Sequence, residues 1–592
     1  MTAFEVTRRI QTGLSETGLN YSVATRGARK APVASWILVA TGWFGWMGIA
    51  HAFPLTDALN PSLVVPSTDP VANTVVTDLT PYLGPPGPFS GVAAPGFTFT
   101  PRISGQTGYN SNVLSSPTSP RPDWVNYLSP GIAVVANTSR IEARLDYSPT
   151  LGIYARTPSQ NFLGQNFTGN GQVTVLEGLA YVDLRGYAGV QPRNGAGFGG
   201  TSGLGGSGAG FNNSSSGLGL PLSQLSQQTS FSITPYLLHK FGDIGTLKIG
   251  YSLTESTSTP VNGFGTIPFF STGSSGLSGN SHLVTNQEVI QFQSGEILGR
   301  VNDLFIINAN QYSGSGVSNG GYQNFVSDRV GYALTRQVTV FGEIGVEDIH
   351  YNGIPPTRIN DGTWLVGTQL TPTADSTMSI GYGHKYGIDS LEANGAYQIT
   401  PRFRVALNYS TGIGNELSQL QNTVAVSDLN QQGGLVNALT GAPLFTSVGT
   451  AGSNNNLYRS KSLTGSATLA LDRDILTLSV SQYDQTVLAT APGSPVGLNT
   501  GNSSSGYSAR AGWTHELSSL LSSIADIYYG TQQNFNGTSG SQNSFSAHLT
   551  LQYQLTETLT ISGQYGYYQR DSPVSALNFN QHLALIGFNK TF

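Results

Sequence analysis

The residue types that most often carry catalysis or hold metals are few and scattered in this chain. Cysteine is absent, which excludes disulfides, zinc-thiolate sites and iron–sulfur clusters. Beyond residue 52 no histidine lies two or four positions from another, so none has the spacing of a ligand pair on one strand or helix. These histidines are His239, His282, His350, His384, His515, His548 and His582. The sequence indicates no metal, no cofactor and no enzymatic activity; the alternative is a hydrolytic Ser–His pair that folding brings together.

One stretch matches a nucleotide-binding motif in letters only. Gly195-Ala196-Gly197-Phe198-Gly199-Gly200 fits G-x-G-x-x-G, but serine, asparagine and more glycine follow it. A phosphate site of this type needs a helix after the motif, because the N–H groups at the helix start bind the phosphate. We interpret the stretch as a flexible loop.

The remaining candidates are charged side chains that alternate with apolar ones. Side chains of a strand point to opposite faces with period two, so Glu142, Arg144 and Asp146 share one face. The whole set is Glu142, Arg144, Asp146, Asp183, Arg185, Lys248, Glu343, Glu347, Lys385, Glu392, Arg404, Arg510 and Arg570. Its near balance of basic and acidic residues argues against a strong ion filter and favours neutral or weakly polar solutes such as sugars. The alternative is that these charges pair across neighbouring strands and only hold a wall together.

The elements that carry these charges are amphipathic strands. In the run from Phe403 to Ser410, every second residue from Phe403 onward is apolar or aromatic and lies on one face. The residues between them are mostly polar and lie on the other face. The same pattern of an aromatic residue, a short polar turn and an alternating strand recurs, most closely at Tyr553–Tyr568. Only 10% of residues are charged, against about 25% in soluble domains. A barrel that faces lipid outside and encloses a polar lumen does not need more charge, and the lumen-facing set above would line it.

We therefore expect an all-β fold, a transmembrane antiparallel β-barrel of about 22 strands (about 18–24), with short periplasmic turns and long extracellular loops. It should run from Phe97–Tyr109 to Gln581–Phe592. Short turns are expected near Ser139, Glu177, Gly242, Arg300, Arg336, Thr373, Thr400, Asp472, Leu517 and Thr556. The long connections are Arg193–Gln227, Thr257–Leu283, Thr411–Tyr458 and Gln485–Ser505. A soluble β-solenoid is disfavoured, because the spacing between turns varies too much for a fixed repeat.

One long connection contains a segment that does not alternate. Within Asn415–Leu439, the residues Leu417, Leu420 and Val424 recur at helical spacing. Known 22-strand barrels carry a plug, and no stretch of this chain reads as a plug domain. We expect Asn415–Leu439 to fold inward as a constriction; an exposed surface loop is the alternative.

The N-terminal residues predict export. Arg26, Arg29 and Lys30 precede an apolar run that ends at Ala50-His51-Ala52, a small-x-small cleavage site. Residues 1–52 are expected to be a signal peptide, with a membrane anchor as the alternative. The remaining chain has 22 basic and 30 acidic residues, so no nucleic-acid partner is indicated. Residues 53–96 are dense in proline and should form an extended periplasmic leader, with partial insertion into the lumen as the alternative.

The other end of the chain predicts assembly. Phe588 and Phe592 lie on one face of the last alternating strand. A terminal aromatic there is the address that outer-membrane barrels present to the barrel assembly machinery. The expected partners are that machinery and outer-membrane lipid, in the outer membrane of a Gram-negative bacterium.

The segment from Phe97 to Pro192 also resembles a family. The motifs are Tyr109-Asn110-Ser111-Asn112-Val113, Leu128-Ser129-Pro130-Gly131-Ile132, Leu145-Asp146-Tyr147 and Ile153-Tyr154-Ala155. They resemble outer-membrane proteins of the β-barrel porin type associated with PEP-CTERM and exopolysaccharide systems. The resemblance implies a porin-like channel for polar solutes, with exopolysaccharide export as its most specific form. A non-conducting scaffold or surface-adhesion barrel acting through its loops is the alternative.

Overall fold

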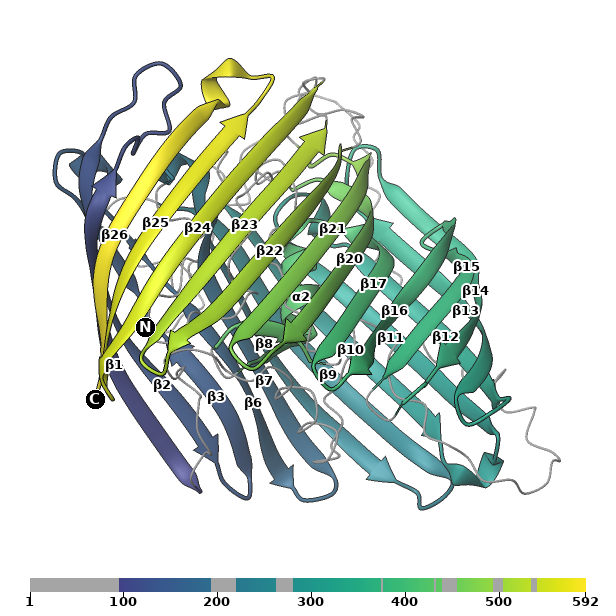
Figure 1. Cartoon of the computed structure of the whole chain (residues 1–592). Coiled ribbons are helices and arrows are strands. Elements are labelled where there is room, and N and C mark those ends of the chain that lie inside the picture. The colour runs from purple at the N-terminus through teal and green to yellow at the C-terminus, as the bar shows by residue number, and fades with distance from the viewer. Residues whose placement is uncertain are drawn as a thin grey trace, which may run out of the picture. The chain divides into compact units, whose positions relative to one another are not determined.

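The computed structural model describes residues 95–192, 220–261, 280–373, 376–430, 433–438, 455–492, 504–533 and 540–592. Their strands form one closed, all-β antiparallel barrel of 22 spans (Figure 1). The predicted barrel of about 22 strands is thereby confirmed. The predicted signal peptide, nearly all of the leader and the glycine motif at 195–200 lie outside the described residues.

Each span of the wall pairs antiparallel with the spans that precede and follow it around the ring. The strands are β1 Gly96–Asn110, β2 Asp123–Asn137, β3 Ile141–Tyr147, β4 Thr150–Tyr154, β5 Phe162–Gly164, β6 Phe167–Leu176, β7 Ala180–Pro192, β8 Leu225–Lys240, β9 Gly245–Pro260, β10 Ser281–Ser294, β11 Val301–Gly314, β12 Tyr322–Ala333, β13 Val338–Tyr351, β14 Thr357–Leu370, β15 Thr377–Lys385, β16 Ile388–Thr400, β17 Phe403–Gly414, β20 Leu457–Ala470, β21 Asp474–Ala489, β22 Ser504–Ser518, β23 Leu521–Gln533, β24 Ser541–Thr556, β25 Leu559–Asp571 and β26 Phe579–Thr591.

Two spans are each split into two strands. β3 and β4 both pair with β2, and β5 and β6 continue one another beside them. At the breaks, Ser148 N–H donates to the carbonyl of Asn166 at 2.9 Å, and the Asn166 amide donates back to Ser148 at 3.0 Å. Gln227 bonds both the N–H and the carbonyl of Gln165, at 2.8 and 2.9 Å. Polar side chains thus supply hydrogen bonds where the ladder is interrupted.

The ring closes between the first and last strands. β1 pairs with β26 from Arg102 opposite Thr591 to Asn110 opposite Leu583. The N–H of Phe592 donates to the carbonyl of Pro101 at 2.9 Å, just beyond the last strand. Unpaired backbone groups cost several kcal/mol each in lipid, so this seam is required for a stable wall.

The two rims differ in connection length. Ten connections of a few residues lie at one rim, at or next to the predicted turn positions. Connections at the other rim are mostly longer; the exceptions are Tyr386-Gly387 between β15 and β16 and residues 352–356 between β13 and β14. Three of the predicted long loops begin too early in the chain, because β9, β17 and β21 continue past the expected ends to Pro260, Gly414 and Ala489.

The outer face of the wall is apolar and the inner face is polar. On β21, Leu478 is 50% exposed with Leu476 and Val480 beside it on the outer face, while Ser479 between them is buried. The same alternation is seen on β26, where Ile586 is exposed and Leu585 is buried. An apolar exterior of this kind suits contact with lipid. Among the described helices, none has the length and apolar character needed to cross a membrane.

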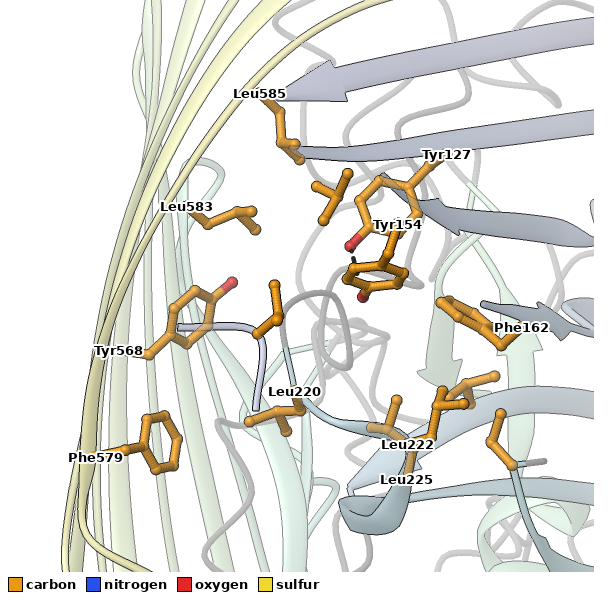
Figure 2. Close-up of a cluster of buried hydrophobic side chains, with 14 residues drawn as sticks. Tyr127, Tyr154, Phe162, Leu220, Leu222, Leu225, Tyr568, Phe579, Leu583 and Leu585 are labelled. Carbon is orange, nitrogen blue, oxygen red and sulfur yellow. Dashed lines mark hydrogen bonds between the residues drawn. The ribbon is translucent and has the colours of Figure 1, made fainter. Parts of the chain in front are cut away.

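Apolar side chains also gather inside the ring near the rim with longer connections. One cluster joins Val113 and Leu220, from two such connections, to Tyr154 of β4 and Leu583 of β26 (Figure 2). A second cluster surrounds Val317, from the connection between β11 and β12. Connections therefore fold back onto the inner wall and reduce the open lumen at this end.

Placing a lysine in the apolar belt should destabilise the barrel. Leu478→Lys puts a charge among Leu476, Val480 and Trp513 and should lower the free energy of unfolding by about 2–4 kcal/mol if that face contacts lipid. The control is Ile354→Lys, since Ile354 is 60% exposed but lies in the connection after β13. Urea unfolding of the barrel in lipid vesicles measures both; equal losses would contradict a lipid-facing belt.

Candidate functional site

The candidate site is an insert between β17 and β20, defined here as residues 415–438. It contains helix α2 (Glu416–Ala425) and a short hairpin of β18 (Ser427–Leu429) and β19 (Leu435–Asn437). The helix begins where the Asn415 side chain accepts the N–H of Ser418 at 2.9 Å, an N-cap that satisfies one free donor. It ends at Ala425. Gly433, with a φ of +78°, lies beyond the helix in the turn of the hairpin.

The apolar stripe of α2 faces the opposite wall. Leu420 and Val424 pack with Leu429 and Leu435 of the hairpin against Ala133 of β2 and Tyr187 of β7. The helix touches β7, β8, β9 and β10, although its chain enters from β17. The insert therefore lies within the ring of strands (Figure 1). Burying each leucine or valine contributes about 1.5–3 kcal/mol, which favours the inward position.

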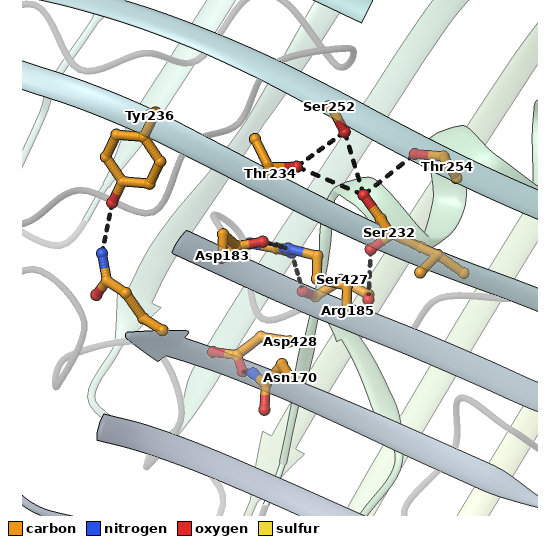
Figure 3. A network of polar contacts seen from close by, with 12 residues as sticks. Asn170, Asp183, Arg185, Ser232, Thr234, Tyr236, Ser252, Thr254, Ser427 and Asp428 are labelled. Carbon is orange, nitrogen blue, oxygen red and sulfur yellow. Dashed lines mark hydrogen bonds and ion pairs between the residues drawn. The ribbon is translucent and has the colours of Figure 1, made fainter. Parts of the chain in front are cut away.

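Polar contacts hold the hairpin to β3, β6 and β7. The Arg185 guanidinium donates to the carbonyl of Ser427, and the Asn170 amide donates to the carboxylate of Asp428 (Figure 3). Arg144 donates to the carbonyl of Leu429 at 3.4 Å. These bonds satisfy backbone groups that an apolar contact would leave unpaired.

Further polar contacts hold the helix to β8, β9 and β10. Gln421 accepts from the Thr285 hydroxyl at 2.6 Å and donates to the carbonyls of Thr254 and Leu283 at 3.4 and 3.3 Å. The Gln228 amide donates to the Glu416 carboxylate at 3.0 Å. α2 is therefore fixed in rotation as well as in position.

The root of the insert is held by the connection between β11 and β12. The Asn415 amide donates to the Ser318 hydroxyl at 3.0 Å, and Val317 N–H donates to the carbonyl of Asn455 at 3.3 Å. Gly316 has a φ of +66°, and a Cβ there would lie 2.2 Å from the Cβ of Asn455. Only glycine fits this approach. The insert is anchored both at its root and at its hairpin, and it therefore crosses the lumen in a fixed position.

Five of the thirteen predicted lumen charges are in ion pairs on the inner wall. The pairs are Arg102–Asp146 at 2.5 Å, Arg185–Asp183 at 2.9 Å, Arg510–Asp526 at 2.5 Å and Arg329–Glu343. Three of these partners, Arg102, Asp526 and Arg329, were missed by the sequence analysis. Strand alternation alone could have found them, because each shares a face with other inward residues.

The other predicted charges hold local structure. Glu347 accepts the N–H groups of Tyr386 and Gly387 at 2.9 and 3.0 Å and so closes the short turn between β15 and β16. Three further cations lie over rings, at distances to the ring centroid of 5.5 Å for Lys385 and Phe325, 4.9 Å for Lys248 and Tyr236, and 5.3 Å for Arg570 and Phe579. Glu142 is exposed, and Glu392 and Arg404 are half-buried on the inner faces of β16 and β17. Most of these charges therefore stabilise the inner wall, and Arg144 and Arg185 also bond the insert.

Leu417, Leu420, Val424 and Asn415 of the predicted constriction are buried in the insert, whereas Leu439 lies outside the described residues. Phe588 lies on the outer face of β26, and Phe592 follows that strand at 72% exposure. Their role in assembly stays a prediction. Within the described part of the chain, no three His, Cys, Asp or Glu side chains are grouped so that they could hold a metal ion.

Residues 484–591 match the model of the family described as "Putative beta-barrel porin 2". This match covers the end of β21 through β26, whereas the resemblance by motif lies at Phe97–Pro192. No curated protein matches the chain. The family match and the barrel fold support an outer-membrane β-barrel of porin type.

Several solved structures align with the chain at low identity. The FrpB iron transporter from Neisseria meningitidis (F5-1 variant) covers 85% of this chain and 83% of its own, at 10% identity and a TM-score of 0.46. The siderophore receptor PiuA from Acinetobacter baumannii covers 85% and 82%, at 9% identity and a TM-score of 0.42. The ferric-catecholate import receptor Fiu from E. coli K12 covers 83% and 81%, at 11% identity and a TM-score of 0.42.

Substitutions at Asn415 should separate its two roles. Asn415→Ala removes both the N-cap and the bond to Ser318 and should make the insert about 1–2 kcal/mol easier to open. Asn415→Asp keeps the cap acceptor but lacks the amide donor, so its effect should be smaller. Hydrogen exchange of the α2 amides measures both variants, with Asn422→Ala, at an exposed position, as the control on the same helix. Unchanged exchange in Asn415→Ala would contradict the anchoring role.

Proposed function

We propose that this protein is an outer-membrane channel for polar solutes whose lumen is narrowed by the insert. The observation that carries the proposal is a helix and hairpin anchored at both ends inside a barrel with an apolar exterior and a polar interior. An unobstructed 22-strand lumen would pass large molecules. The insert, held at its root and at its hairpin, reduces this opening.

The charge arrangement favours uncharged polar solutes. The inner-wall ion pairs neutralise one another, so their fields partly cancel within a few ångströms. A lumen of this kind selects weakly by charge. The proposal involves no catalysis and no cofactor. Exopolysaccharide export is its most specific form, and the motif resemblance at Phe97–Pro192 is its support.

The same proposal fixes an orientation. The rim with short turns would face the periplasm, as in bacterial outer-membrane barrels, and the longer connections would face outward. Residues 1–52 would then act as the signal peptide and 53–96 as a periplasmic leader. Phe588 and Phe592, at the end that closes the seam, would be read by the barrel assembly machinery.

The rival function is a non-conducting scaffold or adhesion barrel. The long connections at one rim are the feature that favours it, since they could present a surface to a partner. Planar-bilayer recordings separate the two, because a scaffold gives no unitary current steps.

Shortening the insert should widen the channel. Replacing residues 416–437 by a short Gly-Ser linker keeps Asn415 and Asn455 at the root, and single-channel conductance should rise severalfold. Cells that carry this variant should also become sensitive to large antibiotics.

The control for the deletion is Leu420→Asn with Val424→Asn, which weakens the apolar contact with Ala133 and Tyr187 but keeps the chain length. Because the insert is still present but held less firmly, this variant should give a current with larger fluctuations and not a uniformly larger current. If the deletion variant assembles and its conductance equals that of the wild type, the insert is not the constriction.

A surface tag tests the orientation. A protease-cleavable tag placed in the connection between β7 and β8 should be cut in intact cells. The same tag in the turn at 241–244, between β8 and β9, should be cut only after the outer membrane is broken. The reverse result would invert the orientation.

A further inference from the structure

A patch of four hydroxyl groups lines the inner wall beside the insert. Ser232 and Thr234 come from β8, and Ser252 and Thr254 come from β9 (Figure 3). All four point inward, because the intervening residues Ile233 and Leu253 are exposed on the outer face. We call these four residues the hydroxyl patch.

The patch hydroxyls bond one another. Thr234 donates to Ser252 at 2.8 Å, Thr254 donates to Ser232 at 3.1 Å, and the Ser232 and Ser252 oxygens lie 3.2 Å apart. A hydroxyl carries one hydrogen and two lone pairs. A set of hydroxyls therefore keeps spare acceptor lone pairs even after each hydrogen has been used inside the set.

The patch is open where the rest of the same ladder is covered. The next pair along these strands, Ser230 and Ser256, is bonded at 2.9 Å and fully buried. The four patch residues are only half-buried. Because α2 contacts β8 and β9, and Gln421 bonds the carbonyl of Thr254, the open part of the ladder begins next to the insert.

The surroundings of the patch are neutral. The cross-strand neighbours of Ser232 and Thr234 are Arg185 and Asp183, which are paired with each other at 2.9 Å. Arg185 also donates to the insert. The three bonds of 2.8–3.2 Å within the patch use three of its four hydroxyl hydrogens, so a dissolved anion would find one donor there. A polyhydroxyl compound would also supply the donors that the spare lone pairs accept.

We infer that the hydroxyl patch is a contact site for neutral saccharides that pass the insert. The inference rests on the proposed channel and names its substrate class. A sugar chain offers hydroxyl groups on both sides, and it can exchange bonds with water for bonds with the patch at little net cost. Such a contact slows the sugar at the narrowed level, so a bound sugar obstructs the ion current for as long as it stays there.

The test uses the full barrel in planar bilayers with maltohexaose as the probe. Sugar should interrupt the wild-type ion current, and the interruptions give an apparent affinity. The patch variant removes all four hydroxyls: Ser232→Ala, Thr234→Val, Ser252→Ala and Thr254→Val. Its affinity for the sugar should fall about tenfold, because several hydrogen bonds are lost together.

The matched control is Thr229→Val with Thr257→Val, on the same two strands. These hydroxyls are 2.7 Å apart on the outer face, and their removal should leave the sugar affinity unchanged. An unchanged affinity in the patch variant, or equal losses in both variants, would overturn the site. Open channels that sugar never interrupts would overturn the site but leave the channel. A barrel that never conducts would overturn both.

Discussion

The structure depends on the pairing of backbone hydrogen bonds around a closed ring. In lipid no water can satisfy a free N–H or carbonyl, so a wall of strands is stable only if the last one pairs with the first. The register between β1 and β26 provides that closure. The same need to pair backbone groups applies at the two split spans, where the side chains of Asn166 and Gln227 bond the backbone at the breaks. The apolar exterior follows from the same environment.

A ring of 22 strands creates a second requirement, because its lumen is wider than wall side chains can fill. The chain meets it with material from its own connections. The insert crosses from β17 to β7, and the connections around Val113 and Val317 fold onto the inner wall. The insert combines an apolar contact at Leu420 and Val424 with bonds from Arg144 and Arg185. The apolar part supplies burial, and the directional bonds fix its position.

The inner-wall charges serve this architecture more than they select ions. Arg102 with Asp146 and Arg510 with Asp526 join neighbouring or nearby strands, and Glu347 closes a turn. Because these charges bond one another or the backbone, hydroxyl and amide groups are the polar groups of the inner wall that remain for contact with a solute. This arrangement is the physical basis for proposing uncharged solutes.

The sequence by itself determined the features that depend on local pattern. Period-two alternation, as at Phe403–Ser410, and the short polar turns predicted an all-β barrel and its strand number, because lipid demands an apolar face on every strand. The spacing of Leu417, Leu420 and Val424 likewise predicted α2. Only the tertiary structure decided which residues meet across the ring. Nothing local relates Arg144 to Leu429, or Asn415 to Ser318, since these partners lie far apart in the chain and are joined by ring closure. Strand alternation places Arg102 on the inner face, but its pairing with Asp146 is a tertiary contact, because β1 and β3 are both neighbours of β2 and the pair forms across it.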